Sequence, residues 1–157
     1  MKGANILLTG GSRGLGLTFA RSLLAAGANI YAVNRSRPAE LETLAGEYTG
    51  SLHICAFDLA KTDSVKPGIF GELIPNGLPL HGFINNAAVA YDDVVTNLNL
   101  EPLEHMFRVN VFTPMMITKN VIRNFLLHRT AGSIIHVSSI SVHTGYKGLT
   151  MYAASKG

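Results

Sequence analysis

Apolar residues gather in five short runs, separated by longer stretches with a helical pattern. The runs are residues 5–9, 29–33, 52–57, 82–85 and 133–138. Within each run the apolar residues are largely continuous rather than alternating with polar ones, which is typical of parallel strands covered on both faces. The pattern therefore predicts five buried parallel strands.

The stretch between the first two runs predicts an amphipathic helix. Leu15, Phe19 and Leu23 are spaced i, i+4 and i+8, so they form one apolar stripe. Gly27 follows the stripe, and glycine favours the backbone conformation that ends a helix.

Three further stretches have helical periodicity, at residues 39–46, 61–73 and 100–128. Pro67 interrupts the second, and Pro114 predicts a kink in the third. Strands that alternate with helices in this way indicate an α/β fold with a doubly wound parallel sheet and right-handed crossovers. No repeat or linker divides the chain, so residues 1–157 are predicted to form one domain, with 71–82 as a loop within it.

Composition narrows the class of protein. The chain is 47% hydrophobic and 15% charged, with a formal net charge of +3, and no basic cluster is dense enough to predict nucleic-acid binding. No apolar run approaches the ~20 residues of a membrane span, and the first one is too short for the core of a signal peptide. Cys55 is the only cysteine and is interpreted as a small buried hydrophobe. A cytoplasmic location is expected.

A glycine-rich segment, TGGSRGLG at residues 9–16, follows the first strand and opens the first helix. Such a turn lets the backbone approach a pyrophosphate, and the helix N-terminus supplies N–H groups and the positive end of its dipole. On its own the segment also fits a tight strand–helix connection. Its spacing, TGxxxGxG, differs from the common GxGxxG pattern.

This segment is one of five motifs that occur in order. With it come INNAA at 84–88, Asn110, Ser139 and YxxxK at 152–156. Together they resemble the short-chain dehydrogenase/reductase family over the whole chain, most of all the 3-oxoacyl-carrier-protein reductases and related carbonyl reductases. The resemblance implies a Rossmann-like fold. One departure is Ala88, where the family usually has glycine; alanine lacks glycine's freedom at positive φ, which bears on the geometry of this loop.

The resemblance implies that a nicotinamide dinucleotide binds beside the glycine-rich segment. The cofactor-binding residues it implies are Gly10, Ser12, Arg13, Gly14, Leu15, Gly16, Asn34, Arg35, Asp58, Leu59, Asn86 and Ala87, together with Tyr152 and Lys156. Asp58 resembles the family's adenine-contacting aspartate, and it could also cap the helix expected near Lys61.

The end of the second strand favours NADP(H) over NAD(H). In dinucleotide folds an acidic residue about 20 residues past the glycine turn bonds the ribose hydroxyls. Asn34 stands at that place, Arg35 and Arg37 follow it, and Arg13 lies in the turn. No carboxylate at that place repels a 2′-phosphate, and guanidinium groups can pair with one. The alternative is that Arg35 and Arg37 are solvated loop charges.

Tyr152 and Lys156 are spaced i, i+4, so both side chains lie on one face of a predicted helix. Tyrosine is a weak acid at neutral pH, and a nearby cation stabilises its phenolate, which suits the pair to proton transfer. On its own the segment also fits a helix start with a surface lysine. The resemblance implies that Tyr152 donates a proton to the substrate carbonyl, and that Lys156 also holds the nicotinamide ribose.

Two more catalytic residues are implied by the resemblance. Ser139 would polarise the substrate carbonyl, with Ser138 as the alternative. Asn110 would hold a local helix kink and a proton-relaying water; the alternative is a helix residue that bonds its own backbone.

The six histidines show no metal-like clustering, so no metal is expected. His53 and His136 lie in predicted strands and are expected in the core. His143 lies in the loop before the YxxxK motif, where a substrate contact is one option.

The leading hypothesis is an NADP(H)-dependent oxidoreductase that transfers hydride between nicotinamide and a small carbonyl or alcohol, with an acyl-carrier-linked substrate as one option. The alternatives are a cofactor-binding fragment without turnover and a remnant that binds nothing. Family members continue past the YxxxK motif with further strands and assemble as homo-oligomers. The chain is therefore expected to be truncated there, without the C-terminal strands.

Overall fold

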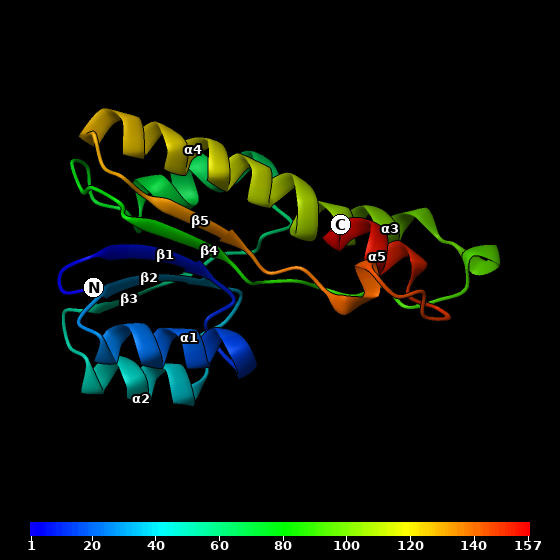
Figure 1. The fold of residues 1–157 in the computed structure, drawn as a ribbon, viewed down its shortest axis with the longest axis horizontal. Coiled ribbons are helices and arrows are strands. Elements are labelled where there is room, and N and C mark those ends of the chain that lie inside the picture. Colours follow the sequence, from blue (N-terminus) through cyan, green and yellow to red (C-terminus); the bar gives the residue numbers. More distant parts are fainter.

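The computed structural model describes all 157 residues and contains one five-stranded parallel sheet (Figure 1). Its strands are β1 (Asn5–Thr9), β2 (Asn29–Asn34), β3 (Leu52–Ala56), β4 (Gly82–Asn85) and β5 (Ser133–His136). All five predicted strands are confirmed. Their ends differ by at most two residues, since β2 extends to Asn34, while β3 ends before Phe57 and β5 ends at His136.

The strand order is β3-β2-β1-β4-β5. The chain moves outward from β1 to β3 and then returns to the other side of β1 as β4. Thr9 at the end of β1 lies level with Val33 of β2 and Asn85 of β4. The order therefore reverses between β1 and β4, and the crevice outside their carboxyl ends is where such sheets bind ligands.

Helices cover both faces of the sheet. Helices α1 (Gly14–Ala25) and α2 (Ala39–Glu47) lie on one face, and α4 (Thr113–His128) lies on the other (Figure 1). Leu7 of β1 belongs to the buried cluster on the α4 face, whereas Ile6 and Leu8 belong to the cluster under α1 and α2. This two-sided burial explains why the strand is apolar at consecutive positions.

Helix α1 begins and ends close to the predicted limits, but its buried face is shifted. The residues it buries are Gly16, Leu17, Ala20 and Leu24. Leu15 is 52% exposed, so its placement in the apolar stripe was wrong. Gly16 packs against Gly10, the residue that follows β1, and this sets the rotation of the helix and leaves the neighbouring Leu15 facing outward.

The two stretches that contain proline are broken. Residues 61–73 form a 3₁₀ turn (Thr62–Ser64) and a π-helical turn (Lys66–Gly71). The stretch predicted as one kinked helix forms α3 (Leu100–Phe107), a π-helical turn (Arg108–Phe112) and α4. Proline has no N–H, so Pro114 cannot donate to the carbonyl of Asn110, and the helix widens in the turn before Pro114.

Strand β5 is the exception to two-sided burial. It pairs with β4 only, so it forms one edge of the sheet, and Ile135 is 53% exposed. His136 is also exposed, so its expected place in the core was wrong; His53 is half-buried and stacks on Tyr31. Cys55 is buried as predicted, and burial raises the pKa of its thiol. None of the helices is both long and apolar enough to cross a membrane.

Candidate functional site

A cavity of about 850 Å³ lies at the carboxyl ends of the central strands. The glycine-rich turn, the segments that follow β2 and β3, and the loop after β4 form its walls. All twelve residues that were predicted to bind the cofactor outside the YxxxK motif line this cavity: Gly10, Ser12, Arg13, Gly14, Leu15, Gly16, Asn34, Arg35, Asp58, Leu59, Asn86 and Ala87.

The glycine-rich turn packs directly against the loop after β4. A Cβ atom on Gly16 would lie 1.9 Å from the carbonyl oxygen of Gly10, and one on Gly10 would lie 2.8 Å from the Cα of Ala87. Gly10 also has φ of +72°. Both positions therefore require glycine, one for space and one for space and conformation.

Hydrogen bonds join the same two segments. The Asn86 Nδ2 donates to the carbonyl of Gly10 at 2.9 Å and to that of Thr9 at 3.3 Å. The Thr9 hydroxyl accepts from the backbone N–H groups of Asn86 and Ala87, both at 3.2 Å, and donates to the Asn85 Oδ1 at 3.2 Å. Thr9 thus organises the floor of the crevice. Sequence analysis did not single it out, although it is the first letter of the TGxxxGxG pattern.

Ala88 fits its loop without strain. It is exposed, and Arg129 is the only residue other than glycine with positive φ. The alanine therefore does not need the conformation that glycine alone adopts readily.

The first turn of α1 has backbone N–H groups available for a ligand. Arg13 is the N-cap residue, no side chain caps the helix, and no acidic residue lies in the first turn. The unbonded N–H groups at a helix start attract anions. Here they face the cavity that the glycine-rich turn lines.

Asn34 is the most unusual side chain in the cavity wall. It is 3% exposed, and neither its Oδ1 nor its Nδ2 has a hydrogen-bond partner. Leaving a buried amide unpaired costs about 1–3 kcal/mol per group. An unpaired donor and acceptor in the wall of a cavity fit a ligand that bonds them.

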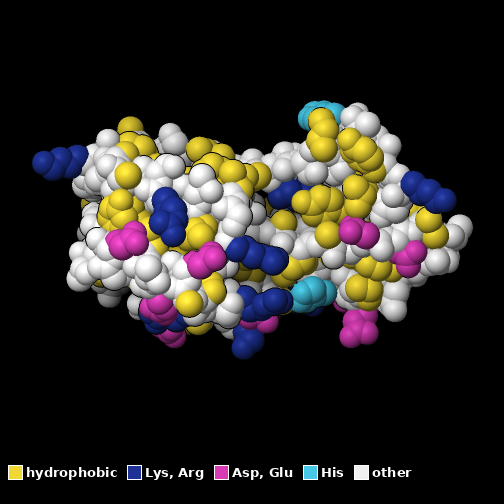
Figure 2. Space-filling view, turned by 90° about the horizontal axis from the view of Figure 1, so that it is seen from below, with side chains coloured by type: hydrophobic (Ala, Val, Ile, Leu, Met, Phe, Trp, Pro, Cys, Tyr) yellow, Lys and Arg dark blue, Asp and Glu magenta, His cyan; other side chains and the backbone are white.

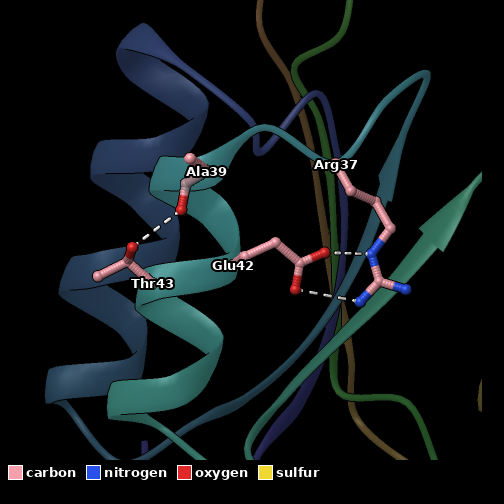
Figure 3. Close-up of polar contacts among 4 residues, drawn as sticks. All are labelled: Arg37, Ala39, Glu42 and Thr43. Atoms are coloured by element: carbon pink, nitrogen blue, oxygen red, sulfur yellow. Dashed lines mark hydrogen bonds and ion pairs between the residues drawn. The ribbon is translucent and has the colours of Figure 1, made fainter.

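Of the three arginines near this wall, two line the cavity. Arg13 and Arg35 are exposed and line it. Arg37 does not: its Nε contacts the Glu42 Oε1 at 2.5 Å, and its Nη2 donates to Oε2 at 3.3 Å. Figure 3 shows the guanidinium of Arg37 facing this carboxylate on α2. Arg37 is thus paired with Glu42 rather than free for a ligand.

The cavity also holds carboxylates. Glu40, at the start of α2, lines it and was missed by sequence analysis. Asp58 lines it as well, and its Oδ1 accepts from the N–H of Ala60 at 2.9 Å. Asp58 therefore caps the turn after β3, and it does so while facing the cavity. On the face seen in Figure 2, basic and acidic side chains lie next to one another and form no large region of one sign.

A second cavity of about 470 Å³ lies between α4, the end of β5 and helix α5 (Thr150–Lys156). Asn110, Ser138, Ser155 and Lys156 line it. Ser139 and Tyr152 line neither of the two cavities. The predicted catalytic residues thus lie around α5 rather than in the wall of the larger cavity.

Asn110 connects these two regions. It is buried in the π-helical turn; its Oδ1 accepts from the Val89 N–H at 2.9 Å, and its Nδ2 donates to the Val89 carbonyl at 2.8 Å. The same Nδ2 donates to the Ser155 Oγ at 2.8 Å. The alternative that Asn110 bonds its own backbone was therefore wrong. Val89 lines the larger cavity, and Ser155 lies in α5.

Tyr152 and Lys156 lie on the same short helix, as predicted. Both are half-buried, and neither the Tyr152 hydroxyl nor the Lys156 Nζ forms a hydrogen bond within the chain. Burial lowers the pKa of Lys156. The polar ends of both side chains are therefore available for a ligand.

The segment after β5 supplies two serines with different contacts. The Ser138 hydroxyl donates to the Lys156 carbonyl at 2.9 Å, which holds the end of α5. The Ser139 Oγ accepts from the Ser141 N–H at 3.3 Å and from the Ser141 hydroxyl at 2.9 Å. Since Ser139 accepts in both bonds, its own hydroxyl hydrogen remains free to donate.

Comparisons with known proteins agree with this geometry. The profile of the family described as short chain dehydrogenase matches residues 4–157. The chain is 34% identical to L-xylulose reductase from Caenorhabditis elegans over 96% of its own length and 59% of the relative's. It is 31% identical to L-rhamnose 1-dehydrogenase (NADP(+)) from Thermoplasma acidophilum over 99% of its own length and 61% of the relative's.

A solved structure agrees as well. It is that of a short-chain dehydrogenase/reductase from Burkholderia vietnamiensis, which superposes with a TM-score of 0.86 at 26% identity and covers 98% of this chain and 73% of that one. The chain spans about 60% of the length of the two curated relatives, L-xylulose reductase and L-rhamnose 1-dehydrogenase (NADP(+)). The narrower likeness to 3-oxoacyl-carrier-protein reductases is not confirmed by these matches. The match over almost the whole chain means that the protein belongs to the short-chain dehydrogenase family.

Proposed function

We propose that the protein is an NADP(H)-dependent oxidoreductase that transfers hydride between the nicotinamide and a small carbonyl or alcohol substrate. The observation that carries the proposal is the unpaired amide of Asn34, buried in the cavity wall beside the free guanidinium groups of Arg13 and Arg35. A phosphorylated ribose supplies hydroxyl and phosphate oxygens that bond such groups. The name of the Thermoplasma relative includes NADP(+), which supports the same cofactor.

The residues present fit a dinucleotide along the cavity. The uncapped first turn of α1 and the glycines around it suit the pyrophosphate, because the backbone can approach closely and donate N–H groups. Arg13 and Arg35, which line the cavity, would hold a 2′-phosphate, and Asp58 would contact the adenine. Glu40 opposes a phosphate by its charge, so the preference for NADP(H) depends on the two guanidinium groups outweighing it.

The chain's own residues would handle the proton. A bound nicotinamide supplies or accepts the hydride. The Tyr152 hydroxyl, free of internal hydrogen bonds, donates a proton to the carbonyl oxygen during reduction. The free hydroxyl hydrogen of Ser139 donates to the same oxygen and polarises the carbonyl. Lys156 favours the phenolate by its charge and holds the ribose hydroxyls of the nicotinamide.

The substrate class follows from the relatives. Two of them are named for reactions of the sugars L-xylulose and L-rhamnose. We therefore propose a small polyhydroxylated carbonyl or alcohol as the first class to assay, with an acyl-carrier-linked carbonyl as the second. We also propose that the protein, when its chain continues to the full length of its relatives, assembles as a homo-oligomer.

A second candidate is a cofactor-binding chain without turnover. It is favoured by the position of Ser139 and Tyr152, which line neither cavity. It differs from the first in having no chemical step.

The two candidates separate in one assay. The protein, continued to the length of its relatives, is tested for NADPH oxidation with sugar carbonyls and acyl-carrier-linked carbonyls, with Tyr152→Phe as the matched variant. Tyr152→Phe should lose turnover and keep NADPH affinity, because only the proton-donating hydroxyl is removed. Turnover retained above about a tenth of the wild-type rate, less than about 1.4 kcal/mol of barrier, would contradict the role of Tyr152. Absent turnover with tight NADPH binding would favour the second candidate.

A further inference from the structure

Ser155 is a buried serine in α5, 6% exposed, directly before Lys156. Its hydroxyl donates to the Tyr152 carbonyl at 2.8 Å and accepts from the Asn110 Nδ2 at 2.8 Å. The Ser155 side chain therefore forms one hydrogen bond within α5, with Tyr152, and one with Asn110 in the π-helical turn. In the sequence, neither the residues expected to bind the cofactor nor the YxxxK spacing indicated a role for Ser155.

The bond to Asn110 leads on to the larger cavity. Asn110 makes two more hydrogen bonds, both with the backbone of Val89, and Val89 lines that cavity. A continuous path of hydrogen bonds therefore runs from the cavity wall at Val89, through Asn110 and Ser155, to the backbone of Tyr152. Both Asn110 and Ser155 are buried, which limits competition from water, most of all for the bond between their two side chains.

Few side-chain hydrogen bonds join α5 to the rest of the fold. The N-cap residue of α5, Leu149, gives no side-chain cap. The side-chain hydrogen bonds that join α5 to other elements are those of Asn110 with Ser155 and of Ser138 with the Lys156 carbonyl. Only the first lies between two buried side chains.

We propose that Ser155 is a positioning residue that fixes Tyr152 and Lys156 relative to the wall of the cofactor cavity. The inference rests on the proposed function, since it concerns the nicotinamide half of a cofactor held in that cavity. Arg13, Arg35 and Asp58, which would hold the adenosine half, lie outside this path of hydrogen bonds. Loss of the Ser155 hydroxyl should therefore weaken contacts to the nicotinamide half and spare those to the adenosine half.

The test compares two ligands on the purified chain. NADPH has both halves, whereas 2′,5′-ADP has only the phosphorylated adenosine half. Wild type should bind NADPH more tightly than 2′,5′-ADP. Ser155→Ala should bind NADPH about fivefold or more weakly than wild type, a change of about 1 kcal/mol, and bind 2′,5′-ADP within about twofold of wild type.

Asn124→Ala is the matched control. Like Asn110, Asn124 bonds the backbone through its amide: its Oδ1 accepts from the N–H of Leu80 at 2.8 Å, and its Nδ2 donates to the carbonyl of Leu78 at 2.9 Å. It lines neither cavity. Its replacement should lower the midpoint of thermal unfolding and leave both dissociation constants unchanged, which separates loss of stability from loss of positioning.

The outcomes separate failure of the positioning role from failure of the proposed function. If Ser155→Ala binds NADPH as wild type does, while wild type prefers NADPH to 2′,5′-ADP, the positioning role is overturned and the proposed function stands. If wild type binds the two ligands equally, the nicotinamide half makes no contact, and both proposals fail. Should Ser155→Ala not fold, Ser155→Cys is nearly isosteric and has a weaker hydrogen-bonding group, so it should weaken NADPH binding selectively, and wild-type affinity would overturn the role.

Discussion

At the scale of single residues, the arginines near the cavity differ in whether a carboxylate of the chain pairs with them. Arg35 faces the cavity, whereas Arg37 is paired with Glu42 on α2. The sequence predicted the cluster of guanidinium groups after β2, because it depends only on residue type and spacing. It could not predict which arginine is free, because the pairing of Arg37 depends on how α2 is rotated against the strand.

Replacement of Arg35 by alanine should weaken NADPH binding by about 1–3 kcal/mol and leave NADH binding nearly unchanged. A charge-assisted bond to a phosphate has about that strength, and NADH has no 2′-phosphate to lose. The two dissociation constants are measured by titrating cofactor fluorescence. Arg37→Ala is the control and should have little effect on either cofactor, because Arg37 is paired with Glu42. Equal weakening of both cofactors by Arg35→Ala would contradict a phosphate contact.

Lys156 predicts a pH dependence of stability. Burial lowers its pKa in the folded chain, while the unfolded chain keeps the ordinary value near 10.4. Between these two values the unfolded state binds more protons, so this lysine lowers stability at neutral pH and stops doing so as the pH approaches 10.4. Lys156→Met should therefore be more stable than wild type at pH 7, with a difference that shrinks toward pH 10.

The measurement is denaturant unfolding of the chain without cofactor at several pH values. Burial raises the pKa of Cys55, so stability falls above about pH 9 in both proteins and this effect cancels in the difference. If the difference in unfolding free energy between Lys156→Met and wild type stays constant from pH 7 to pH 10, burial does not disfavour the charged form of Lys156.

At the scale of elements, the strands followed from the sequence more closely than the helices did. Continuous apolar runs marked all five strands, because burial on both faces leaves a strong local pattern. The predicted kink before Pro114 is present as the π-helical turn between α3 and α4, but the separation into two helices was not predicted. That turn is held by the bonds of Asn110 to Val89, which lies 21 residues earlier in the chain, and such a contact leaves no local pattern.

The junction between β1 and α1 gives a prediction at this scale. Gly16→Ala should lower the free energy of unfolding by about 1–3 kcal/mol or more, because its Cβ would lie 1.9 Å from the Gly10 carbonyl. Gly46→Ala is the matched control. Gly46 lies within α2, and its Cβ would meet no atom within 4 Å, so the change should stabilise the chain by about 0.5–1 kcal/mol.

Chemical denaturation followed by circular dichroism measures both glycine variants against wild type. NADPH affinity should fall for Gly16→Ala and stay unchanged for Gly46→Ala, since only the first lies in the cavity wall. If Gly16→Ala were as stable as wild type, the close packing of Gly16 on Gly10 would be wrong.

At the scale of the whole molecule, the reversal of strand order between β1 and β4 places the glycine-rich turn, Asn34 and Asp58 around one cavity. The sequence could predict this gathering, because the carboxyl ends of parallel strands share one edge. It could not predict that Ser139 and Tyr152 line neither cavity, because the placement of α5 depends on contacts distant in the sequence, such as that of Ser155 with Asn110. The position of α5 is thus the least predictable part of the candidate site.

The proposed selection of NADP(H) by this cavity is tested most directly by titrating the purified chain with NADPH and with NADH. Both dissociation constants are measured by fluorescence at low and at high salt. NADPH should bind more tightly than NADH, with a preference that shrinks as salt screens the exposed Arg13 and Arg35. Equal dissociation constants for the two cofactors at low salt, or tighter binding of NADH, would contradict the proposed selection.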